Sequence, residues 1–304
     1  MRSTSGQQEF ITLRKFTELL SRFIPVIRYA PHIEQGAYLG QNRYLTRTAY
    51  GCKIFLDTRD MTLVPHIILN GIWEPAVTRV ITDFLQPGQR VLEVGSNLGW
   101  YTLLIAHHIG PSGRLISFEA NADLAKFTFD SICINGFTER VQLHSLAVSD
   151  KTGETTFYVR GRHLGNSSLG KASQEHLDEL YDSLQSIVTP TVALDTFLQG
   201  NDRKIDLMKI DVEGAEPLVF KGMEQILREN ENITIIMEYS PLQMQGIGLD
   251  PAEAMSMLFQ LGFNAYQIEN PSAELIPANA ETLRQIVHCD LVLSRSPLPI
   301  GNKP

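Results

Sequence analysis

Short segments that combine glycines with acids are the part of this chain best suited to chemistry. In residues 91–99, glycines stand at positions 95 and 99 and an acid at Glu93. Glycine permits a tight strand-to-helix turn and a close approach of the backbone to a ligand, while the free N–H groups of the next helix can bind a carboxylate. Glu93 suits the ammonium group of an amino-acid moiety. The glycine spacing matches neither G-x-G-x-x-G nor a P-loop, which disfavours an NAD-dependent oxidoreductase.

Glu119 and residues 144–150 lie at the ends of the next two expected strands. An acid at the position of Glu119 can accept hydrogen bonds from both hydroxyls of a ribose. The backbone of residues 144–150 would lie beside an adenine ring, although an ordinary strand end accounts for these residues equally well. Together with the first segment, Glu119 indicates a site for an adenosyl group.

Further acids gather where the fourth expected strand meets a helix. Asp211, Glu213 and Glu216 lie there, and Glu238 ends the neighbouring strand. Acids near a helix N-terminus stabilise its dipole by about 0.3–1 kcal/mol each. This could account for Glu213 and Glu216, accounts less well for Asp211 and does not account for Glu238. Because ligands bind at the carboxyl ends of strands in such sheets, we expect these acids to face the ligand. Asp211 and Glu238 could also present oxygen ligands to a divalent metal ion, with helix capping as the competing explanation.

The elements that would position these residues alternate between short apolar strands and helices. The strands are expected at residues 90–94, 114–118, 141–147, 205–210 and 233–238. Helices are expected to begin near Trp100, Asp123 and Glu216. This alternation is typical of parallel strands joined by right-handed crossovers, and therefore of a doubly wound α/β sheet.

Elements before and after this region complete the expected domain. A helix is expected over residues 74–84, and Asp250 is expected to cap another helix that begins at Pro251. Strands near residues 265–268 and 290–294 would close the chain.

We expect a main domain over residues 71–296, an extension over residues 1–70 and a tail over residues 297–304. In the extension, apolar residues recur at helical spacing from Phe10 to Phe23, which predicts an amphipathic helix that packs on the main domain or on a second subunit, as in a homodimer. Residues 160–188 are rich in glycine and serine and interrupt the βα rhythm. They are expected to form an insertion over the ligand face.

Composition narrows the function classes. The 304 residues carry a formal net charge of −8, which disfavours nucleic acid as a partner because phosphate-binding surfaces concentrate Lys and Arg. The three cysteines show no metal-ligand spacing, so they are expected to be buried, reduced thiols of a cytoplasmic protein. We expect no membrane span, since no run reaches the roughly 18 apolar residues required.

In their order, these segments resemble the FkbM family of methyltransferases. The resemblance extends from Gly71 to Glu238 and is most specific in residues 209–216, Lys-Ile-Asp-Val-Glu-Gly-Ala-Glu. It implies a Rossmann-like class I methyltransferase fold, with a mostly parallel sheet and an antiparallel strand near the C-terminus. It also implies S-adenosyl-L-methionine as the methyl donor and a hydroxyl oxygen of a small molecule, natural product or sugar as the acceptor. The alternative is a catalytically inactive adenosyl-binding or scaffold protein, which the complete set of acids disfavours.

The resemblance and the motifs together give a set of expected site residues. Those expected to line the cofactor are Glu74, Glu93, Gly95, Ser96, Asn97, Gly99, Thr102, Glu119, Ala120, Ala147 and Asp211. At residues 93–99 the family more often has Asp-Val-Gly-Ala-Asn-Ile-Gly. This chain differs at three of these positions, with Glu93, Ser96 and Leu98 in place of Asp, Ala and Ile. The acidic charge and the small residue are kept.

Methyl transfer to an alcohol also requires a general base or a metal ion. Asp211 is our first candidate base because a strand end holds it rigidly, provided that it is largely buried so that its pKa rises. Glu213 lies beside it. His163 in the insertion is a further candidate, since histidine ordinarily titrates near pH 6.5, although an exposed loop histidine is the simpler interpretation.

Overall fold

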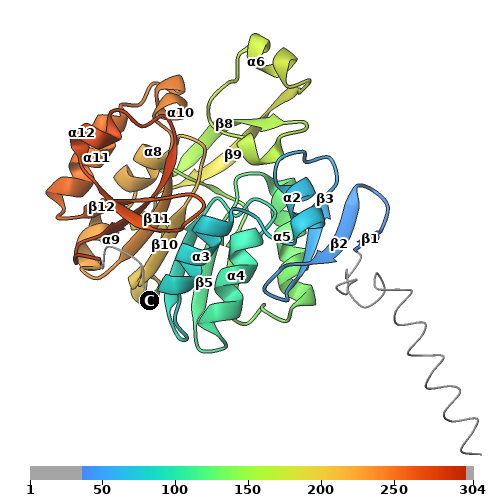
Figure 1. Cartoon of the computed structure of the whole chain (residues 1–304), viewed down its shortest axis with the longest axis horizontal. Helices are drawn as coiled ribbons and strands as arrows, with labels where there is room; N and C mark the ends of the chain where they lie inside the picture. The colour runs from blue at the N-terminus through green and yellow to red at the C-terminus, as the bar shows by residue number, and fades with distance from the viewer. Residues whose placement is uncertain (1–35, 299–304) are drawn as a thin grey trace, which may run out of the picture. The chain divides into compact units, whose positions relative to one another are not determined.

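A computed structural model describes residues 36–298 of the chain (Figure 1). The helix and the subunit contact expected near residues 10–23 lie outside this range. The compact unit that contains the described residues begins at Gly36. Residues 36–70 therefore belong to the main unit rather than to the extension that we expected over residues 1–70.

The centre of the fold is an eight-stranded sheet of order β13-β12-β14-β11-β10-β4-β5-β6. Its parallel body consists of β4 (Arg90–Val94), β5 (Arg114–Phe118), β6 (Val141–His144), β10 (Leu207–Ile210) and β11 (Thr234–Tyr239). The remaining strands are β12 (Asn264–Ile268), β13 (Leu275–Ala278) and β14 (Cys289–Ser294). Because β14 runs antiparallel to both β11 and β12, the predicted α/β fold with an antiparallel strand near the C-terminus is confirmed.

Helices cover both faces of this sheet (Figure 1). One buried apolar cluster joins the sheet to α3 (Pro75–Phe84), α4 (Trp100–Ile109) and α5 (Ala122–Ile134). The cluster on the other face includes α8 (Glu216–Lys221), α9 (Glu224–Glu229) and α11 (Pro251–Gln260). The shorter helices are α2 (Leu63–Asn70), α6 (Gln174–Glu179), α7 (Leu194–Phe197), α10 (Pro241–Gly246) and α12 (Ala280–Leu283). As predicted, the Asp250 side chain caps α11 by accepting the N–H of Ala252.

Two small sheets flank the central one. The first consists of β1 (Ala37–Tyr38), β2 (Arg43–Arg47) and β3 (Lys53–Asp57). It is joined to α5 by hydrogen bonds, because the Ser131 hydroxyl accepts the N–H of Phe55 and the Asn135 side chain accepts that of Lys53. Buried side chains of β3 and α2 also belong to the apolar cluster that contains α3, α4 and α5, so this region shares the core of the main domain.

The second small sheet, of order β7-β9-β8, carries the insertion. Its strands are β7 (Ala147–Val148), β8 (Gly153–Arg160) and β9 (Leu184–Val192). The insertion expected over residues 160–188 is therefore part of an antiparallel hairpin that starts earlier, and the segment between its two strands contains α6 and a short 3₁₀ helix. The strand expected over residues 141–147 ends at His144, since β7 leaves the central sheet to pair with β9.

Two further findings concern membrane-spanning helices and the cysteines. None of the helices in the described part of the chain is long and apolar enough to cross a membrane. Cys52 and Cys289 are buried free thiols as expected, whereas Cys133 is exposed on the last turn of α5.

Candidate functional site

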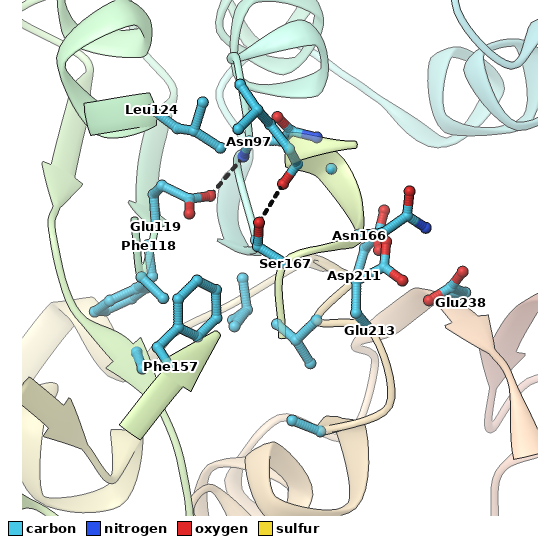
Figure 2. A pocket seen from close by; sticks show the side chains of 18 of the residues that line it. Asn97, Phe118, Glu119, Leu124, Phe157, Asn166, Ser167, Asp211, Glu213 and Glu238 are labelled. Carbon is cyan, nitrogen blue, oxygen red and sulfur yellow. Dashed lines mark hydrogen bonds between the residues drawn. The ribbon is translucent and has the colours of Figure 1, made fainter. Parts of the chain in front are cut away.

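A cavity of about 260 Å³ opens at the carboxyl ends of β4, β5 and β10, where open α/β sheets bind their ligands. The hairpin tip contributes to its wall through Phe157 of β8 and through the short 3₁₀ helix η1 (Leu164–Asn166). Figure 2 shows two groups of polar side chains in this cavity, with Glu119 on one side and Asp211, Glu213 and Glu238 on the other. The insertion was predicted to cover the ligand face, and its tip does line the cavity.

Strained backbone marks this cavity. Glu74, Asn97 and Glu213 line it with φ angles of 40°, 50° and 55°. A non-glycine residue in this left-handed region carries a conformational cost that usually persists only where function requires a side chain in a given place. Of the seven non-glycine residues with positive φ in the described part of the chain, these three lie in loops that line the cavity.

Gly95 shows why the first motif needs glycine. Its φ is 90°, and a Cβ atom there would lie 1.8 Å from the carbonyl oxygen of Asp211. The Asp211 N–H also donates to the carbonyl of Val94, at 2.9 Å. The glycine therefore lets the loops after β4 and β10 touch, which brings the first and fourth motifs together at the cavity.

Glu119 forms one end of the cavity. Its side chain accepts the N–H groups of Asn97 and Asn121, at 2.7 and 2.8 Å. The residue is only 6% exposed, and burial raises the pKa of its carboxyl to about 7 despite these two hydrogen bonds. Phe118 and Leu124 provide apolar walls beside it (Figure 2).

Glu93 does not face the cavity. It is fully buried, and its Oε2 accepts hydrogen bonds from the hydroxyls of Thr102 and Ser117, both at 2.6 Å. Our expectation that Glu93 contacts a ligand ammonium group disagrees with this arrangement, because its side chain points between β5 and α4. Ser96, Gly99 and Thr102 likewise lie outside the cavity lining, whereas the expected cofactor residues that do line it are Glu74, Gly95, Asn97, Glu119, Ala120, Ala147 and Asp211.

The opposite end of the cavity is acidic. Carboxylate oxygens of Asp211, Glu213 and Glu238 lie within 4.8 Å of one another. Gln243 donates a hydrogen bond to Glu213, and the imidazole of His288 lies 3.5 Å from Glu238. Burial and the neighbouring carboxylates raise the pKa values of Glu213 and Glu238 well above their ordinary range. Such a cluster can share a proton, bind a cation or accept hydrogen bonds from a ligand.

The structure separates the three candidate bases. Asp211 lines the cavity, but its side chain is 32% exposed and paired with Lys209 at 2.8 Å, so it does not meet the condition of being largely buried. Glu213 is also only partly buried, but burial and the neighbouring carboxylates raise its pKa well above the ordinary range, as a base near neutrality requires. His163 lies outside the lining, because its ring bonds the carboxylate of Asp182 at 3.0 Å.

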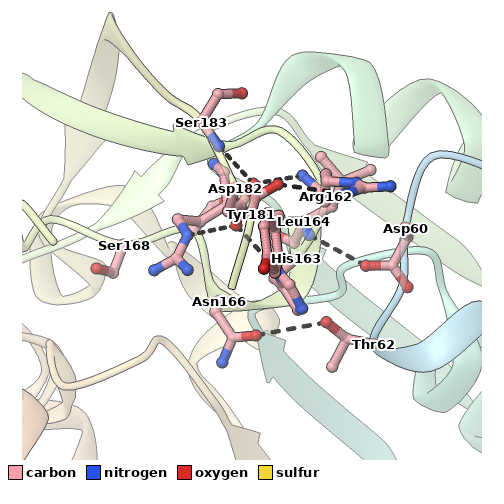
Figure 3. A network of polar contacts seen from close by, with 12 residues as sticks. Asp60, Thr62, Arg162, His163, Leu164, Asn166, Ser168, Tyr181, Asp182 and Ser183 are labelled. Atoms are coloured by element: carbon pink, nitrogen blue, oxygen red, sulfur yellow. Dashed lines mark hydrogen bonds and ion pairs between the residues drawn. The ribbon is translucent and has the colours of Figure 1, made fainter. Parts of the chain in front are cut away.

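A polar network around Asp182 explains the position of His163 (Figure 3). Asp182 also accepts a hydrogen bond from the Arg160 guanidinium, at 2.7 Å. Although burial opposes its ionisation, the hydrogen bonds from Arg160 and His163 hold the pKa of Asp182 well below its ordinary range. His163 therefore anchors the hairpin tip and does not line the cavity, which argues against our expectation that it acts as the base.

The hairpin tip is attached to the main fold at a second point. The buried Asp60 carboxylate accepts the N–H of Leu164, at 3.0 Å, and caps α2 through the N–H groups of Leu63 and Val64. This places Asn166 over the acidic end of the cavity (Figure 2). Sequence reasoning missed Phe157, Asn166 and His288 as lining residues. The glycine- and serine-rich insertion was a signal for Asn166, but Phe157 lies before it.

The cavity has a one-sided charge distribution. Five carboxylates line it: Glu74, Glu119, Asp211, Glu213 and Glu238. In the described part of the chain, no lysine or arginine side chain lines it, and Lys209 lies behind the wall. A further carboxyl behind the acidic end, Asp290, has its pKa raised to about 8, chiefly by burial.

Comparison with known proteins supports the sequence resemblance. The profile described as the methyltransferase FkbM domain matches residues 93–265. The 31-O-demethyl-FK506 methyltransferase FkbM of Streptomyces tacrolimicus is 30% identical over an alignment of 164 positions, which covers 46% of this chain and 61% of that protein. A protein-L-isoaspartate O-methyltransferase of Triticum aestivum is 33% identical over 86 residues, 28% of this chain and 34% of that protein. The chain thus spans about a third to three fifths of the length of the curated relatives it matches.

Among solved structures, the O-methyltransferase TomG of Streptomyces achromogenes, determined in complex with S-adenosylmethionine, gives a TM-score of 0.42 at 14% identity. The comparison covers 73% of this chain and 79% of that one. The family assignment depends on the profile, whose match to residues 93–265 covers more than half of the sequence. The chain therefore belongs to the FkbM family of S-adenosylmethionine-dependent methyltransferases.

Proposed function

We propose that this protein transfers a methyl group from S-adenosylmethionine to a hydroxyl oxygen of a neutral small molecule or sugar. The observation that carries the proposal is the charge of the cavity, which is lined by carboxylates and, among the described residues, by no lysine or arginine. A carboxylate or phosphate acceptor would find no lysine or arginine among these lining residues to compensate its charge. A hydroxyl acceptor would instead find hydrogen-bond acceptors on several sides.

The cavity residues suit the adenosyl part of the donor. A carboxylate has about four lone-pair positions, and two backbone N–H groups already bond the Glu119 carboxylate. Because Glu119 lines the cavity, the remaining positions would be available to accept the two ribose hydroxyls. Ala120, Ala147 and Phe118 line the adjoining wall, where small or apolar side chains leave room for an adenine ring.

The acidic end is where the acceptor would bind. When bound, S-adenosylmethionine supplies an electrophilic methyl group, which the acceptor oxygen takes as the sulfonium becomes a thioether. Glu213 would accept the hydroxyl proton, because its raised pKa brings a carboxylate closer to the proton affinity that a base needs near neutrality. Asp211 and Asn166, beside Glu213 in the lining, would orient the hydroxyl.

A divalent metal ion is the alternative means of acidifying the hydroxyl. The observation that favours it is the clustering of oxygen atoms from Asp211, Glu213 and Glu238 within 4.8 Å, since hard cations prefer such ligands. In that arrangement the three residues would hold the ion as ionised carboxylates. Metal dependence of the methyl-transfer rate separates the two mechanisms.

The acceptor class can be tested with radiolabelled S-adenosylmethionine and a panel of acceptors. The panel contains neutral hydroxylated compounds (free sugars, alkyl glycosides and macrolide alcohols), an isoaspartyl peptide as a carboxylate acceptor, and a sugar phosphate as an anionic hydroxyl compound. We expect label in one or more neutral hydroxylated compounds and none in the peptide or the phosphate. Methylation of the isoaspartyl peptide alone would refute the hydroxyl assignment.

An inactive adenosyl-binding protein would behave differently in the same experiment. It would bind S-adenosylmethionine in calorimetry but would label no acceptor, even in an extended panel of hydroxylated compounds. The Glu213→Gln variant provides the matched negative control, since it should retain donor binding while losing transfer.

A further inference from the structure

Lys209 is a buried, charged residue next to the cavity. It takes no part in the chemistry proposed above. It lies in β10, where Leu207 and Lys209 point to the sheet face covered by α4, and Met208 and Ile210 point to the other face. Its side chain is 7% exposed. A buried ammonium group is costly unless partners compensate it, so its contacts show what it does.

The ammonium group connects two carboxylates of the cavity wall. Its Nζ lies 2.8 Å from Oδ2 of Asp211 and 4.7 Å from the centre of the Tyr101 ring. The hydroxyl of Tyr101 in turn donates to Oε2 of Glu74, at 2.7 Å. Lys209 and Tyr101 thus lie behind the wall, while Asp211 and Glu74, which they contact, line the cavity.

Among the described residues, the other charged groups near Lys209 form no direct hydrogen bond with its ammonium group. Glu93 is its direct neighbour in the register of β4 and β10, but the Glu93 carboxylate accepts hydrogen bonds from Thr102 and Ser117. Asp290 of β14 also acts on it electrostatically. Asp211 is the carboxylate that Lys209 bonds directly.

We propose that Lys209 is a positioning residue that holds the Asp211 carboxylate directly, and the Glu74 carboxylate through Tyr101, at the acidic end of the cavity. The inference rests on the proposed function, in which Asp211 orients the acceptor hydroxyl. Lys209 itself touches neither the donor nor the acceptor. Its effect on the reaction is one of alignment, and a displacement of about 1 Å at a reacting centre can reduce a rate about a hundredfold.

The first test uses Lys209→Met, with Lys221→Met as the matched control. Lys221 forms an ion pair with Glu253 on the protein surface, away from the cavity. With a hydroxylated acceptor from the panel, we expect Lys209→Met to lower kcat by about a hundredfold while calorimetry shows little change in the Kd of S-adenosylmethionine. The Lys221→Met variant should keep both values. An unchanged kcat in Lys209→Met would overturn the proposal.

A second variant tests whether Lys209 positions Asp211 or only neutralises the buried charge of Glu93. The double variant Glu93→Gln/Lys209→Met removes two opposite buried charges together, so it should recover thermal stability if Lys209→Met alone folds poorly. We expect its kcat to stay low, because Asp211 is still released. If kcat recovers together with the melting temperature, Lys209 only neutralises Glu93, and the proposal is wrong.

A third readout does not depend on any acceptor. In a crystal structure of the double variant with S-adenosylhomocysteine, we expect the Asp211 carboxylate to leave its present orientation or to occupy more than one. An Asp211 carboxylate that keeps its place would overturn the inference. Failure of the whole acceptor panel would instead refute the proposed function, so the two failures can be told apart.

Discussion

Replacement of Glu119 by glutamine tests the proposed donor site most directly. Both carboxylate oxygens of Glu119 are already bonded, one by the N–H of Asn97 and one by that of Asn121. An amide in this place can accept only one of these bonds, and its NH₂ group cannot accept a ribose hydroxyl. The variant should therefore lose affinity for S-adenosylmethionine while the rest of the cavity lining stays the same.

The magnitude follows from the bonds that are lost. A hydrogen bond to a charged group contributes about 1.5–3 kcal/mol, which corresponds to about a 10- to 150-fold increase in Kd. Because burial raises the pKa of Glu119 to about 7, part of the unliganded protein is protonated at this site near neutrality. Ribose donors prefer the ionised carboxylate, so binding should release a proton.

The raised pKa of Glu119 also determines the direction in which donor affinity changes with pH. Donor affinity should fall as the pH drops below about 7 and be about tenfold weaker at pH 6 than well above the pKa. Stability of the unliganded protein should change in the opposite direction. A raised carboxyl pKa contributes stability that is fully present below the unfolded pKa and is lost as the pH rises through about 7.

Isothermal titration calorimetry of S-adenosylmethionine between pH 6 and 8 measures both effects. Glu154→Gln, an exposed change on β8 away from the cavity, is the matched control. The Glu119→Gln variant should bind weakly and lose the part of the pH dependence that comes from this carboxyl. A Kd within twofold of the unmodified protein, or a full pH dependence in the variant, would refute the reasoning.

Four further results are expected. Glu213→Gln should lower kcat by about a hundredfold or more, as loss of a general base does, whereas calorimetry should show donor binding retained; near-normal turnover would exclude Glu213 as the base. Asp211→Asn should also lower kcat but by a smaller factor, and a larger loss than in Glu213→Gln would reverse the two roles. His163→Ala should leave kcat within about threefold and lower the melting temperature, because this ring bonds Asp182 rather than facing the cavity; a hundredfold loss of kcat in a folded variant would restore it as a base. Excess chelator should leave the methyl-transfer rate unchanged if a carboxylate is the base, and a rate that returns only with added divalent ion would favour the metal mechanism.

Local patterns determined much of the fold. The apolar runs at residues 90–94 and 114–118 became strands with those bounds, since fully buried parallel strands need continuous apolar residues. The Asp250-Pro251 pair began a helix, because capping depends on neighbouring residues only. Glycine at position 95 likewise indicated a special turn, as its φ of 90° confirms. Such features depend on contacts close in sequence.

Side-chain direction and neighbourhood were decided by the tertiary structure alone. Glu93 and Glu119 both lie at strand ends, yet one is enclosed beneath α4 and the other reaches the cavity, because the pleat and the covering helix select the face. His163 bonds Asp182 only because the hairpin folds back on itself. The acids Asp211 and Glu238 meet because β10 and β11 are adjacent in the sheet. Distances between residues far apart in sequence depend on how strands are ordered and paired, and local patterns carry no direct measure of that order.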